Sequence, residues 1–295
     1  MSHNDEVPAV SIHPLTVVNP LAEIGPGVKI GPYCVIEPNA SIGPDCILES
    51  HVVIKEGTTL GPRNRVFEGA VLGGLPQHVH IPERPGKVVI GSGNTIRENV
   101  TIHRALDENH STFIGDNCLL MVNSHVAHDC HIGNNVILTN NVMLAGHITV
   151  GDKAYLSGAA GVHQFCRIGT LAMVGGQAHV SQDIPPFVTV DGISSLVVGL
   201  NQVGLRRAGY DLAKIQQLKA AYRVIYRSGL MWKEILEILR TDFAYGPASI
   251  FYEFLSTTKR GIVSERRMPP NATLKIQPRE AEEETLPQRK ARAAG

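Results

Sequence analysis

The sequence predicts an all-β fold, a parallel β-helix built of six-residue repeats, followed by an α-helical C-terminal domain. Three observations predict it. An Ile, Leu or Val returns at every sixth residue from Ile12 to Val180, with two interruptions. Gly and Pro recur directly after these aliphatic residues, where short strands turn corners. Beyond Pro185 and Pro186 the apolar residues change to a helical period.

The repeat occupies residues 12–186 and comprises 26 hexads, each with an aliphatic residue in its first position. A hexad of one short strand and one corner cannot bury its own aliphatic side chain, so the hexads must stack on one another. The cysteines stand in the fifth position of their hexads, where small inward-facing residues recur, and we interpret them as packing residues: Cys34, Cys46, Cys118, Cys130 and Cys166.

The remaining segments divide the chain. Residues 1–11 form an N-terminal arm. Two segments break the six-residue period, a polar, Pro-rich loop at 75–88 and a shorter one at 105–112. Loops that leave a rigid solenoid are where binding groups are expected. Residues 187–263 form the helical domain, and the charged segment 264–295, poor in apolar residues, is predicted to be a disordered tail.

The first predicted helix of the C-terminal domain carries one apolar face, with Asp211 placed to cap its N-terminus. Two further helices are expected from apolar residues near 235–239 and 250–255.

Composition excludes several classes of protein. Lys and Arg together number 27, as do Asp and Glu, so no charge excess favours a nucleic acid partner. No run of about 18 apolar residues predicts a transmembrane segment. The first residues lack the basic and apolar regions of a signal peptide, so we expect a cytoplasmic protein.

Histidines gather in one part of the repeat. With 18 residues in each coil of three hexads, Gly146 lies one coil above His128 and Gln164 lies two coils above it. Adjacent coils are separated by about 4.8 Å, the usual strand spacing. One corner over three coils should therefore be lined by His125, His128, Gly146, His147, His163 and Gln164. The other corners carry Gly, Asn, Asp and Pro, which favours a binding or catalytic site over a merely polar surface.

Several motifs resemble one family of enzymes. They are His125-Val-Ala-His128-Asp-Cys, Leu144-Ala-Gly-His147, Val162-His163-Gln-Phe-Cys166, Ile96-Arg-Glu-Asn-Val-Thr-Ile-His-Arg104, Ser181-Gln-Asp-Ile-Pro-Pro-Phe187 and Tyr226-Arg-Ser-Gly229. Over roughly residues 10–265 the chain resembles the acyl-(acyl carrier protein)–UDP-N-acetylglucosamine O-acyltransferases, which perform the first step of lipid A biosynthesis. The resemblance implies a left-handed, triangular β-helix.

The resemblance also implies roles. His128 is the general base that activates the 3-hydroxyl of the sugar, and the Gly146 backbone N–H stabilises the oxyanion. Substrates would be oriented by His125, His147, His163 and Gln164. Asp129 is a possible orienter of His128, although consecutive strand residues point to opposite faces, which argues against direct pairing. Gly176 matches the residue that bounds the acyl-chain pocket, and glycine there resembles the long-chain version.

Some positions match the family pattern and others depart from it. Asn201 and Arg207 match nucleotide-contacting residues. In the 75–88 loop, His78 and His80 stand where the family commonly has an aspartate and a lysine that hold phosphate or sugar groups. A neutral histidine donates to phosphate but lacks the permanent charge of lysine. Two further departures are Val203 and Ala208, in place of a glutamate and an arginine.

We therefore predict a homotrimer with active sites between subunits, and no cofactor. It would transfer a (3-hydroxy)acyl chain from acyl carrier protein to UDP-N-acetylglucosamine. Basic residues that could receive the acidic carrier protein are Arg206, Arg207, Arg223, Arg227, Lys259 and Arg260.

Four alternatives remain open from sequence. One is an acyltransferase of the same repeat class that acts on a different sugar nucleotide or on an amine. Another is the related N-acyltransferase of the same pathway, which normally has an extra N-terminal domain. The third is a metal-dependent enzyme similar to the carbonic anhydrases that share this repeat, since three imidazoles on neighbouring coils could hold zinc. No carboxylate-rich surroundings accompany the histidines, so we predict no metal. The last is a scaffold without catalytic activity.

Overall fold

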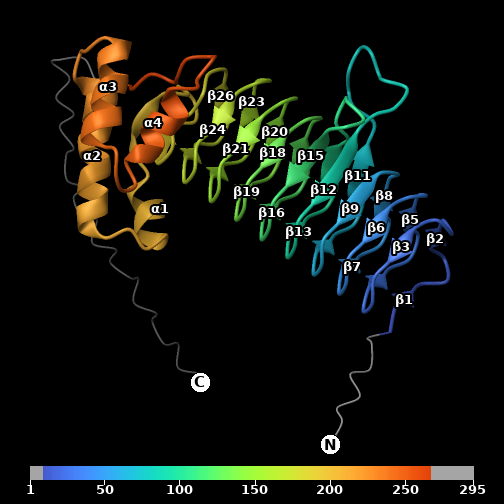
Figure 1. The fold of residues 1–295 in the computed structure, drawn as a ribbon. Helices are drawn as coiled ribbons and strands as arrows, with labels where there is room; N and C mark the ends of the chain where they lie inside the picture. Colours follow the sequence, from blue (N-terminus) through green and yellow to red (C-terminus); the bar gives the residue numbers. More distant parts are fainter. Residues whose placement is uncertain (1–8, 267–295) are drawn as a thin grey trace, which may run out of the picture.

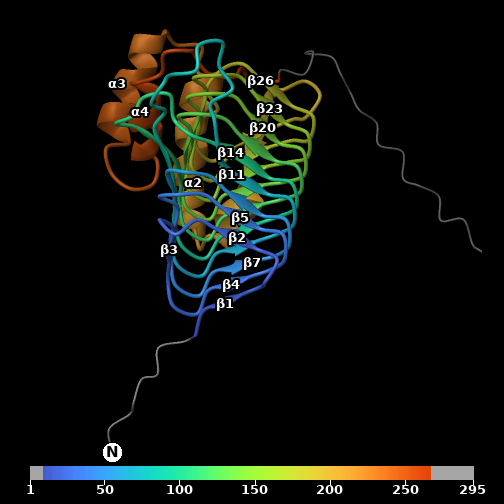
Figure 2. The same cartoon turned by 90° about the vertical axis from the view of Figure 1, so that its right-hand side faces the viewer.

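The computed structural model describes residues 9–266, which form a three-sided β-helix capped at its C-terminal end by helices (Figure 1). Figure 2, turned by 90°, shows the successive coils stacked along the length of the prism. Each coil contributes one short strand to each of three sheets, and strands of successive coils pair in parallel. The predicted β-helix and its helical extension are thus confirmed.

Each of the three sides is one sheet of short strands, in which every strand is hydrogen-bonded to the next. The first sheet runs through β1 (Ser11–Ile12), β4 (Lys29–Ile30), β7 (Ile47–Leu48), β10 (Arg65–Val66), β13 (Thr95–Ile96), β16 (Leu119–Leu120), β19 (Ile137–Leu138), β22 (Tyr155–Leu156), β25 (Met173–Val174), β27 (Val188–Val190) and β28 (Val197–Leu200). The second runs through β2 (Val17–Val18), β5 (Val35–Ile36), β8 (Val53–Ile54), β11 (Val71–Gly74), β14 (Thr101–His103), β17 (His125–Val126), β20 (Met143–Leu144), β23 (Gly161–Val162) and β26 (His179–Val180). The third runs through β24 (Arg167–Ile168), β21 (Thr149–Val150), β18 (His131–Ile132), β15 (Ser111–Ile114), β12 (Lys87–Ile90), β9 (Thr58–Leu60), β6 (Ser41–Ile42) and β3 (Glu23–Ile24).

The core is the column of aliphatic residues that the repeat predicts. Val126 pairs with Leu144 on the next coil and Leu144 with Val162, so residues 18 apart stack directly. All three are at most 3% exposed. The five cysteines are buried and unpaired, as predicted. Burial raises the pKa of the Cys130 thiol to about 12, so this sulfur is a packing group at neutral pH.

Many corners of the prism hold a non-glycine residue in the left-handed backbone conformation. Asn residues recur at these positions, for example Asn123 and Asn141, because a short amide tolerates a positive φ better than most side chains. Asp129 and His147 occupy two of these corners, with φ of 59° and 60°. A residue in this conformation no longer follows the alternation of a strand, and this places polar side chains beside one another at the corner.

Both interruptions of the repeat are loops that leave the prism without breaking its stacking. Thr101 pairs with Val71 below it and with His125 above it, so the coils continue across the insertions. Arg104 fastens the first loop, because its guanidinium donates from Nε to the Gly86 carbonyl at 2.6 Å and from Nη2 to the Pro85 carbonyl at 2.8 Å.

The strands continue beyond Pro185 and Pro186. β27 pairs in parallel with β25, and β28 returns antiparallel to β27 before the first helix begins. The helices are α1 (Gln202–Arg207), α2 (Leu212–Arg227), α3 (Trp232–Asp242) and α4 (Ser249–Leu255). The Asp211 side chain accepts a hydrogen bond from the Lys214 N–H and caps α2, as predicted.

A second apolar core holds the helices together and contains the fully buried Leu218, Leu239 and Phe251. Residues 264–266 lie against β28, since Val197 exchanges backbone hydrogen bonds with Ser264 and Arg266. The rest of the predicted tail, and residues 1–8 of the predicted arm, lie outside the described residues. Within residues 9–266, no helix has the length and apolarity needed to cross a membrane.

The close stacking of coils predicts a contrast between two glycines. A Cβ atom added at Gly115 would lie 2.7 Å from the Gly133 backbone of the next coil, whereas one added at Gly161 meets nothing within 4 Å. We expect Gly115→Ala to destabilise the fold by about 1–3 kcal/mol, because the coils must move apart. Gly161→Ala should have a midpoint of thermal unfolding close to that of the unsubstituted protein. Equal midpoints for the two variants, measured by circular dichroism, would contradict this expectation.

Candidate active site

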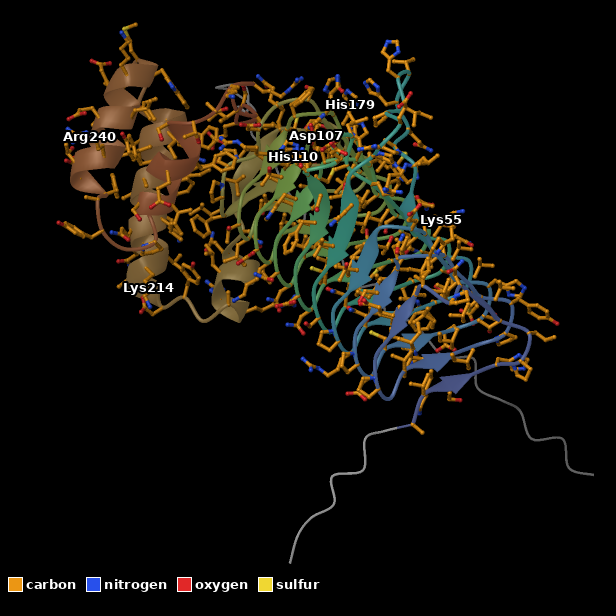
Figure 3. All side chains as sticks on the ribbon, turned by 45° about the vertical axis from the view of Figure 1, so that its right-hand side comes forward. Lys55, Asp107, His110, His179, Lys214 and Arg240 are labelled. Carbon is orange, nitrogen blue, oxygen red and sulfur yellow. The ribbon has the colours of Figure 1, made fainter. Side chains whose placement is uncertain are left out.

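A cavity of about 730 Å³ lies on the outer flank of the second sheet, and we name it the histidine pocket. Its floor is a ladder of outward-facing residues from successive coils, in register from Thr101 through His125, Met143 and Gly161 to His179. The loop at 75–88 contributes to its wall. Its lining comprises Gln77, His78, Thr101, Asn123, His125, Ala127, His128, Met143, Leu144, Ala145, Gly146, Gly161, Val162, His163, Gln164 and His179. In Figure 3, His179 marks the C-terminal end of this ladder.

His128 and Asp129 form a hydrogen-bonded pair at the edge of this pocket. Nδ1 of His128 lies 2.8 Å from Oδ2 of Asp129, and the two side chains are 8% and 10% exposed. Strand alternation disfavours this contact, and the expectation drawn from it is wrong because Asp129 has a positive φ, which turns its side chain back toward its neighbour. The carboxylate also accepts a hydrogen bond from the Leu106 N–H, and the Asp129 N–H donates to Thr112 Oγ1.

Gly146 lies directly against the His128 ring. A Cβ atom at Gly146 would be 2.7 Å from Nε2 of His128, so only glycine allows the backbone to approach the ring this closely. Since Nδ1 of His128 is bonded to Asp129, Nε2 is the nitrogen that can meet a substrate. This nitrogen and the Gly146 backbone therefore lie side by side at the pocket edge.

Two further histidines surround this pair. The His147 ring stands edge-on to His128 at 5.1 Å between centroids and stacks on Phe165 at 4.6 Å. Burial lowers the pKa of His147, although the nearby Asp129 carboxylate opposes that effect. His78 reaches the same place from the 75–88 loop, with its ring edge-on to His128 at 5.8 Å. Nδ1 of His78 is held by the His80 backbone, 3.1 Å from its N and 3.0 Å from its O.

The predicted histidine cluster is thus assembled, although its members differ in their position relative to the pocket. His163 and Gln164 line the pocket and are exposed, and Nδ1 of His163 lies 3.2 Å from the Gln164 carbonyl oxygen. His147 contacts His128 from beside the pocket without lining it. His80 is exposed and reaches the cluster only through His78.

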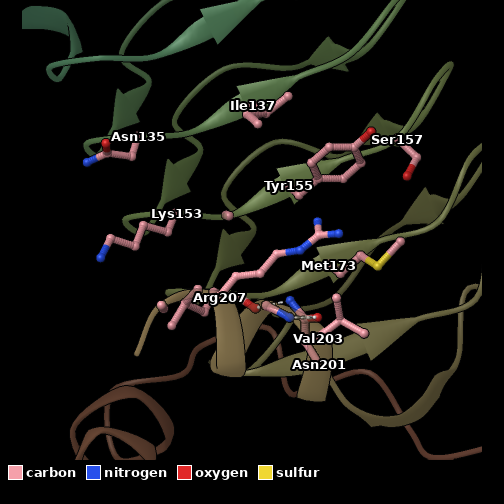
Figure 4. A pocket seen from close by; sticks show the side chains of 13 residues that line it. Asn135, Ile137, Lys153, Tyr155, Ser157, Met173, Asn201, Val203 and Arg207 are labelled. Atoms are coloured by element: carbon pink, nitrogen blue, oxygen red, sulfur yellow. Dashed lines mark hydrogen bonds between the residues drawn. The ribbon is translucent and has the colours of Figure 1, made fainter. Parts of the chain in front are cut away.

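Asn201 and Arg207 lie elsewhere in the chain. They line a second cavity, of about 710 Å³, between the first sheet and α1 (Figure 4). The Asn201 amide forms hydrogen bonds within the chain, because Oδ1 accepts from the Gly204 N–H and Nδ2 donates to the Leu171 carbonyl. Figure 4 shows the Arg207 guanidinium directed into the cavity below Tyr155, and Val203 and Ala208 are also in the lining. Within one chain, these residues do not join the histidine pocket.

Gly176 lies beside the second cavity. A Cβ atom there would be 3.3 Å from the Gly158 carbonyl oxygen and 3.9 Å from Cβ of Ser157, and Ser157 is part of the cavity wall. The apolar side of the cavity consists of Ile137, Tyr155 and Met173, which face outward at equivalent positions of three consecutive coils. These three residues are 18 apart in sequence, the length of one coil, so their stacking could have been predicted from the repeat alone.

One group of residues in the described part of the chain has the spacing of metal ligands. Ligand atoms of His128, Asp129 and His147 lie within 4.8 Å of one another. Two of these atoms, Nδ1 of His128 and Oδ2 of Asp129, share a hydrogen bond of 2.8 Å. An ion bound by both atoms would replace the proton of this hydrogen bond.

The chain has the stacked six-residue repeats of the hexapeptide-repeat proteins, with a polar pocket on one flank. A family model described as bacterial transferase hexapeptide matches residues 21–56 and 111–146. Another, described as UDP-N-acetylglucosamine O-acyltransferase, domain 2, matches residues 183–263.

Individual relatives give the particular family. An acyl-(acyl carrier protein)–UDP-N-acetylglucosamine O-acyltransferase of Halorhodospira halophila is 42% identical over 85% of this chain and 98% of its own length. The corresponding protein of Gloeothece citriformis is 49% identical over 62% of this chain and 67% of its own length. The structure of Francisella novicida UDP-N-acetylglucosamine acyltransferase is 38% identical, covers 88% of this chain and 95% of its own, and superimposes with a TM-score of 0.83.

The chain therefore belongs to the acyl-(acyl carrier protein)–UDP-N-acetylglucosamine O-acyltransferase family and is an O-acyltransferase. The resemblance inferred from the histidine motifs is confirmed, and so is the left-handed β-helix that it implied.

Buried histidines beside the pocket predict how stability depends on pH. Burial, and then the nearby His125 and His128, lower the pKa of His103 from 6.5 to about 4. In the unfolded chain His103 is therefore protonated below about pH 6.5, whereas in the folded chain it is protonated only below about pH 4. The free energy of unfolding decreases as pH falls through this window. We expect His103→Phe to remove up to about 3 kcal/mol of that loss. Identical pH profiles of urea unfolding for the two proteins would contradict the prediction.

Proposed function

We propose that the chain transfers a (3-hydroxy)acyl group from acyl carrier protein to the 3-hydroxyl of UDP-N-acetylglucosamine, the first step of lipid A biosynthesis. The names of its relatives support both substrates. The single observation that carries the proposal for the chemistry is the His128–Asp129 pair next to the Gly146 backbone. A sugar hydroxyl is a weak nucleophile at neutral pH, and a buried imidazole with an oriented free nitrogen is suited to activate it.

In the proposed mechanism Asp129 accepts a hydrogen bond from Nδ1–H of His128, which fixes the tautomer and leaves the lone pair of Nε2 toward the pocket. As the sugar oxygen attacks the thioester carbonyl, Nε2 takes the hydroxyl proton. The Gly146 N–H stabilises the negative oxygen of the tetrahedral intermediate, a contribution of about 3 kcal/mol. The intermediate collapses by breaking the C–S bond, and the leaving sulfur takes the proton back from His128.

The remaining residues of the pocket would bind the acceptor. His125 and His147 have a pKa lowered by burial, so both are neutral hydrogen-bonding groups at pH 7. His163 and Gln164 provide exposed polar groups to the lining of the same cavity. His78, held through Nδ1 by the His80 backbone, has its ring 5.8 Å from that of His128, and it stands where the family commonly has a carboxylate.

A homotrimer would complete the site. The histidine pocket lies on the flank of the second sheet, whereas Asn201 and Arg207 lie on the flank of the first sheet. If the first sheet of one subunit faces the second sheet of its neighbour, the two cavities combine. Both flanks carry the apolar residues that such contacts need, since Val17 and Val35 on the second sheet are 64% and 36% exposed and Tyr155 on the first is 37% exposed.

The acyl carrier protein would dock on basic residues of the helical domain. Lys219 and Arg223 line a shallow cavity of about 280 Å³ next to β28. Arg227 lines it too, but its guanidinium also forms an ion pair with Glu265 at 2.6 Å.

Five buried, unpaired thiols are consistent with the reducing cytoplasm as the compartment.

Substitution of His128 tests the reaction. We expect His128→Ala to lower the rate at least about 10²-fold and Asp129→Asn to lower it by a similar factor, because either change removes the oriented base. The readout is mass spectrometry of products from UDP-N-acetylglucosamine and a panel of 3-hydroxyacyl carrier proteins.

His131→Ala is the matched control, since His131 is an exposed histidine on the third sheet and should leave the rate within about twofold. Treatment with a chelator should also leave the rate unchanged. Loss of activity after chelation would favour the metal-dependent alternative, and full activity of His128→Ala would remove His128 from the mechanism.

The preferred length of the acyl chain tests whether the second cavity, beside Gly176, binds the acyl group. We expect Gly176→Met to shift the preferred acyl chain to a shorter one, because the new side chain would occupy space beside Ser157 at the cavity wall. The shift should be at least about tenfold in relative kcat/KM between long and short donors. An unchanged preference in a variant with an unchanged midpoint of unfolding would exclude Gly176 from the acyl pocket.

A further inference from the structure

Strand β14 lies directly beneath His125 and supports it with two side chains. Thr101 and His125 are register partners on adjacent coils, and Oγ1 of Thr101 lies 2.7 Å from Nδ1 of His125. Either direction of this hydrogen bond leaves Nε2 as the His125 nitrogen that can meet a ligand. His103 is two residues further along the strand and stands edge-on to the His125 ring, 4.9 Å between centroids at 86°.

His103 is enclosed in a narrow slot. His103 is 9% exposed, and its backbone is in register with that of Gly74 on the coil below. A Cβ atom at Gly74 would lie 3.0 Å from Cδ2 and 3.1 Å from Nε2 of His103, so the glycine is what leaves space for the ring. Within residues 9–266, Nδ1 of His103 has no hydrogen-bond partner, so the ring acts on its surroundings through contact.

The enclosure also fixes the charge of His103. With a pKa of about 4 it is neutral at pH 7, so it contributes no positive charge next to His125 and His128. A neutral ring packed edge-on holds a neighbouring ring by shape and by weak edge-to-face attraction. Rotation of the His125 ring toward β14 would have to displace the buried His103 ring, which lies close to the Gly74 backbone.

We propose that His103 is a positioning residue for the acceptor pocket, which together with Thr101 fixes the His125 ring so that Nε2 faces the sugar nucleotide. What the pocket binds rests on the proposed function, while the positioning of His125 does not. The next residue, Arg104, holds the carbonyls of Pro85 and Gly86, so the segment 101–104 supports both His125 and the loop that carries His78.

Steady-state kinetics separate positioning from a purely structural role. We expect His103→Ala to raise KM for UDP-N-acetylglucosamine about tenfold with kcat within about threefold, because the loosened His125 binds the acceptor less well but His128 is untouched. His103→Phe, which keeps a ring in the slot, should restore KM to within about twofold of the unsubstituted protein. Gly74→Ala, which pushes on the His103 ring without removing it, should raise KM in the same direction.

A second measurement needs no substrate. In protein labelled with ¹³C at histidine Cε1, the His125 signal is assigned by its loss in His125→Gln and then titrated. Burial holds the pKa of His125 below its ordinary value, so His103→Ala should raise it toward 6.5 and His103→Phe should leave it low.

An unchanged His125 titration in folded His103→Ala, or a KM that stays at the unsubstituted value, would overturn the proposal. So would equal losses in His103→Ala and His103→Phe. If the unsubstituted protein does not acylate UDP-N-acetylglucosamine at all, the proposed function fails, and the titration still decides whether His103 positions His125.

Discussion

The structure depends on one constraint, the vertical stacking of coils whose aliphatic residues are buried only by the coils above and below. A side chain such as Leu144 is shielded because Val126 and Val162 lie directly beneath and above it. Backbone hydrogen bonds between coils fix the same spacing, so position along the chain converts directly into height along the prism. The residues of the site that belong to the coils are therefore placed by a periodic frame, and His78 comes from the inserted loop.

The chemistry of the site comes from corners where the frame changes direction. A left-handed backbone conformation at Asp129 turns its carboxylate back onto His128, which a continuing strand would forbid. The same conformation at His147 places a second ring beside the first. Gly146, with no side chain, allows the backbone to close against Nε2. The repeat thus supplies the position of each residue, and the corner geometry supplies their contacts.

The histidine pocket is also supported by residues of the coil beneath His125. The segment 101–104 carries a hydroxyl and a ring beneath His125 and a guanidinium that holds the 75–88 loop. The cavity that contains Arg207 lies on a different flank, so one chain separates residues that the family pattern groups together. Assembly of subunits, rather than folding of one chain, is the step we propose to unite them.

The sequence by itself determined the β-helix, its inward aliphatic and cysteine positions and the corner that gathers the histidines, because a strict period of six fixes which residues stack on one another. The family followed from the histidine motifs. It did not predict β27 and β28, which lie at the start of the segment 187–263 that was expected to be helical. Only the tertiary structure decided that Asp129 pairs with His128, that His103 lies under His125, and that Asn201 and Arg207 stand apart from the histidines. These contacts depend on backbone angles at corners and on the path of the inserted loops, and neither is encoded in spacing along the chain.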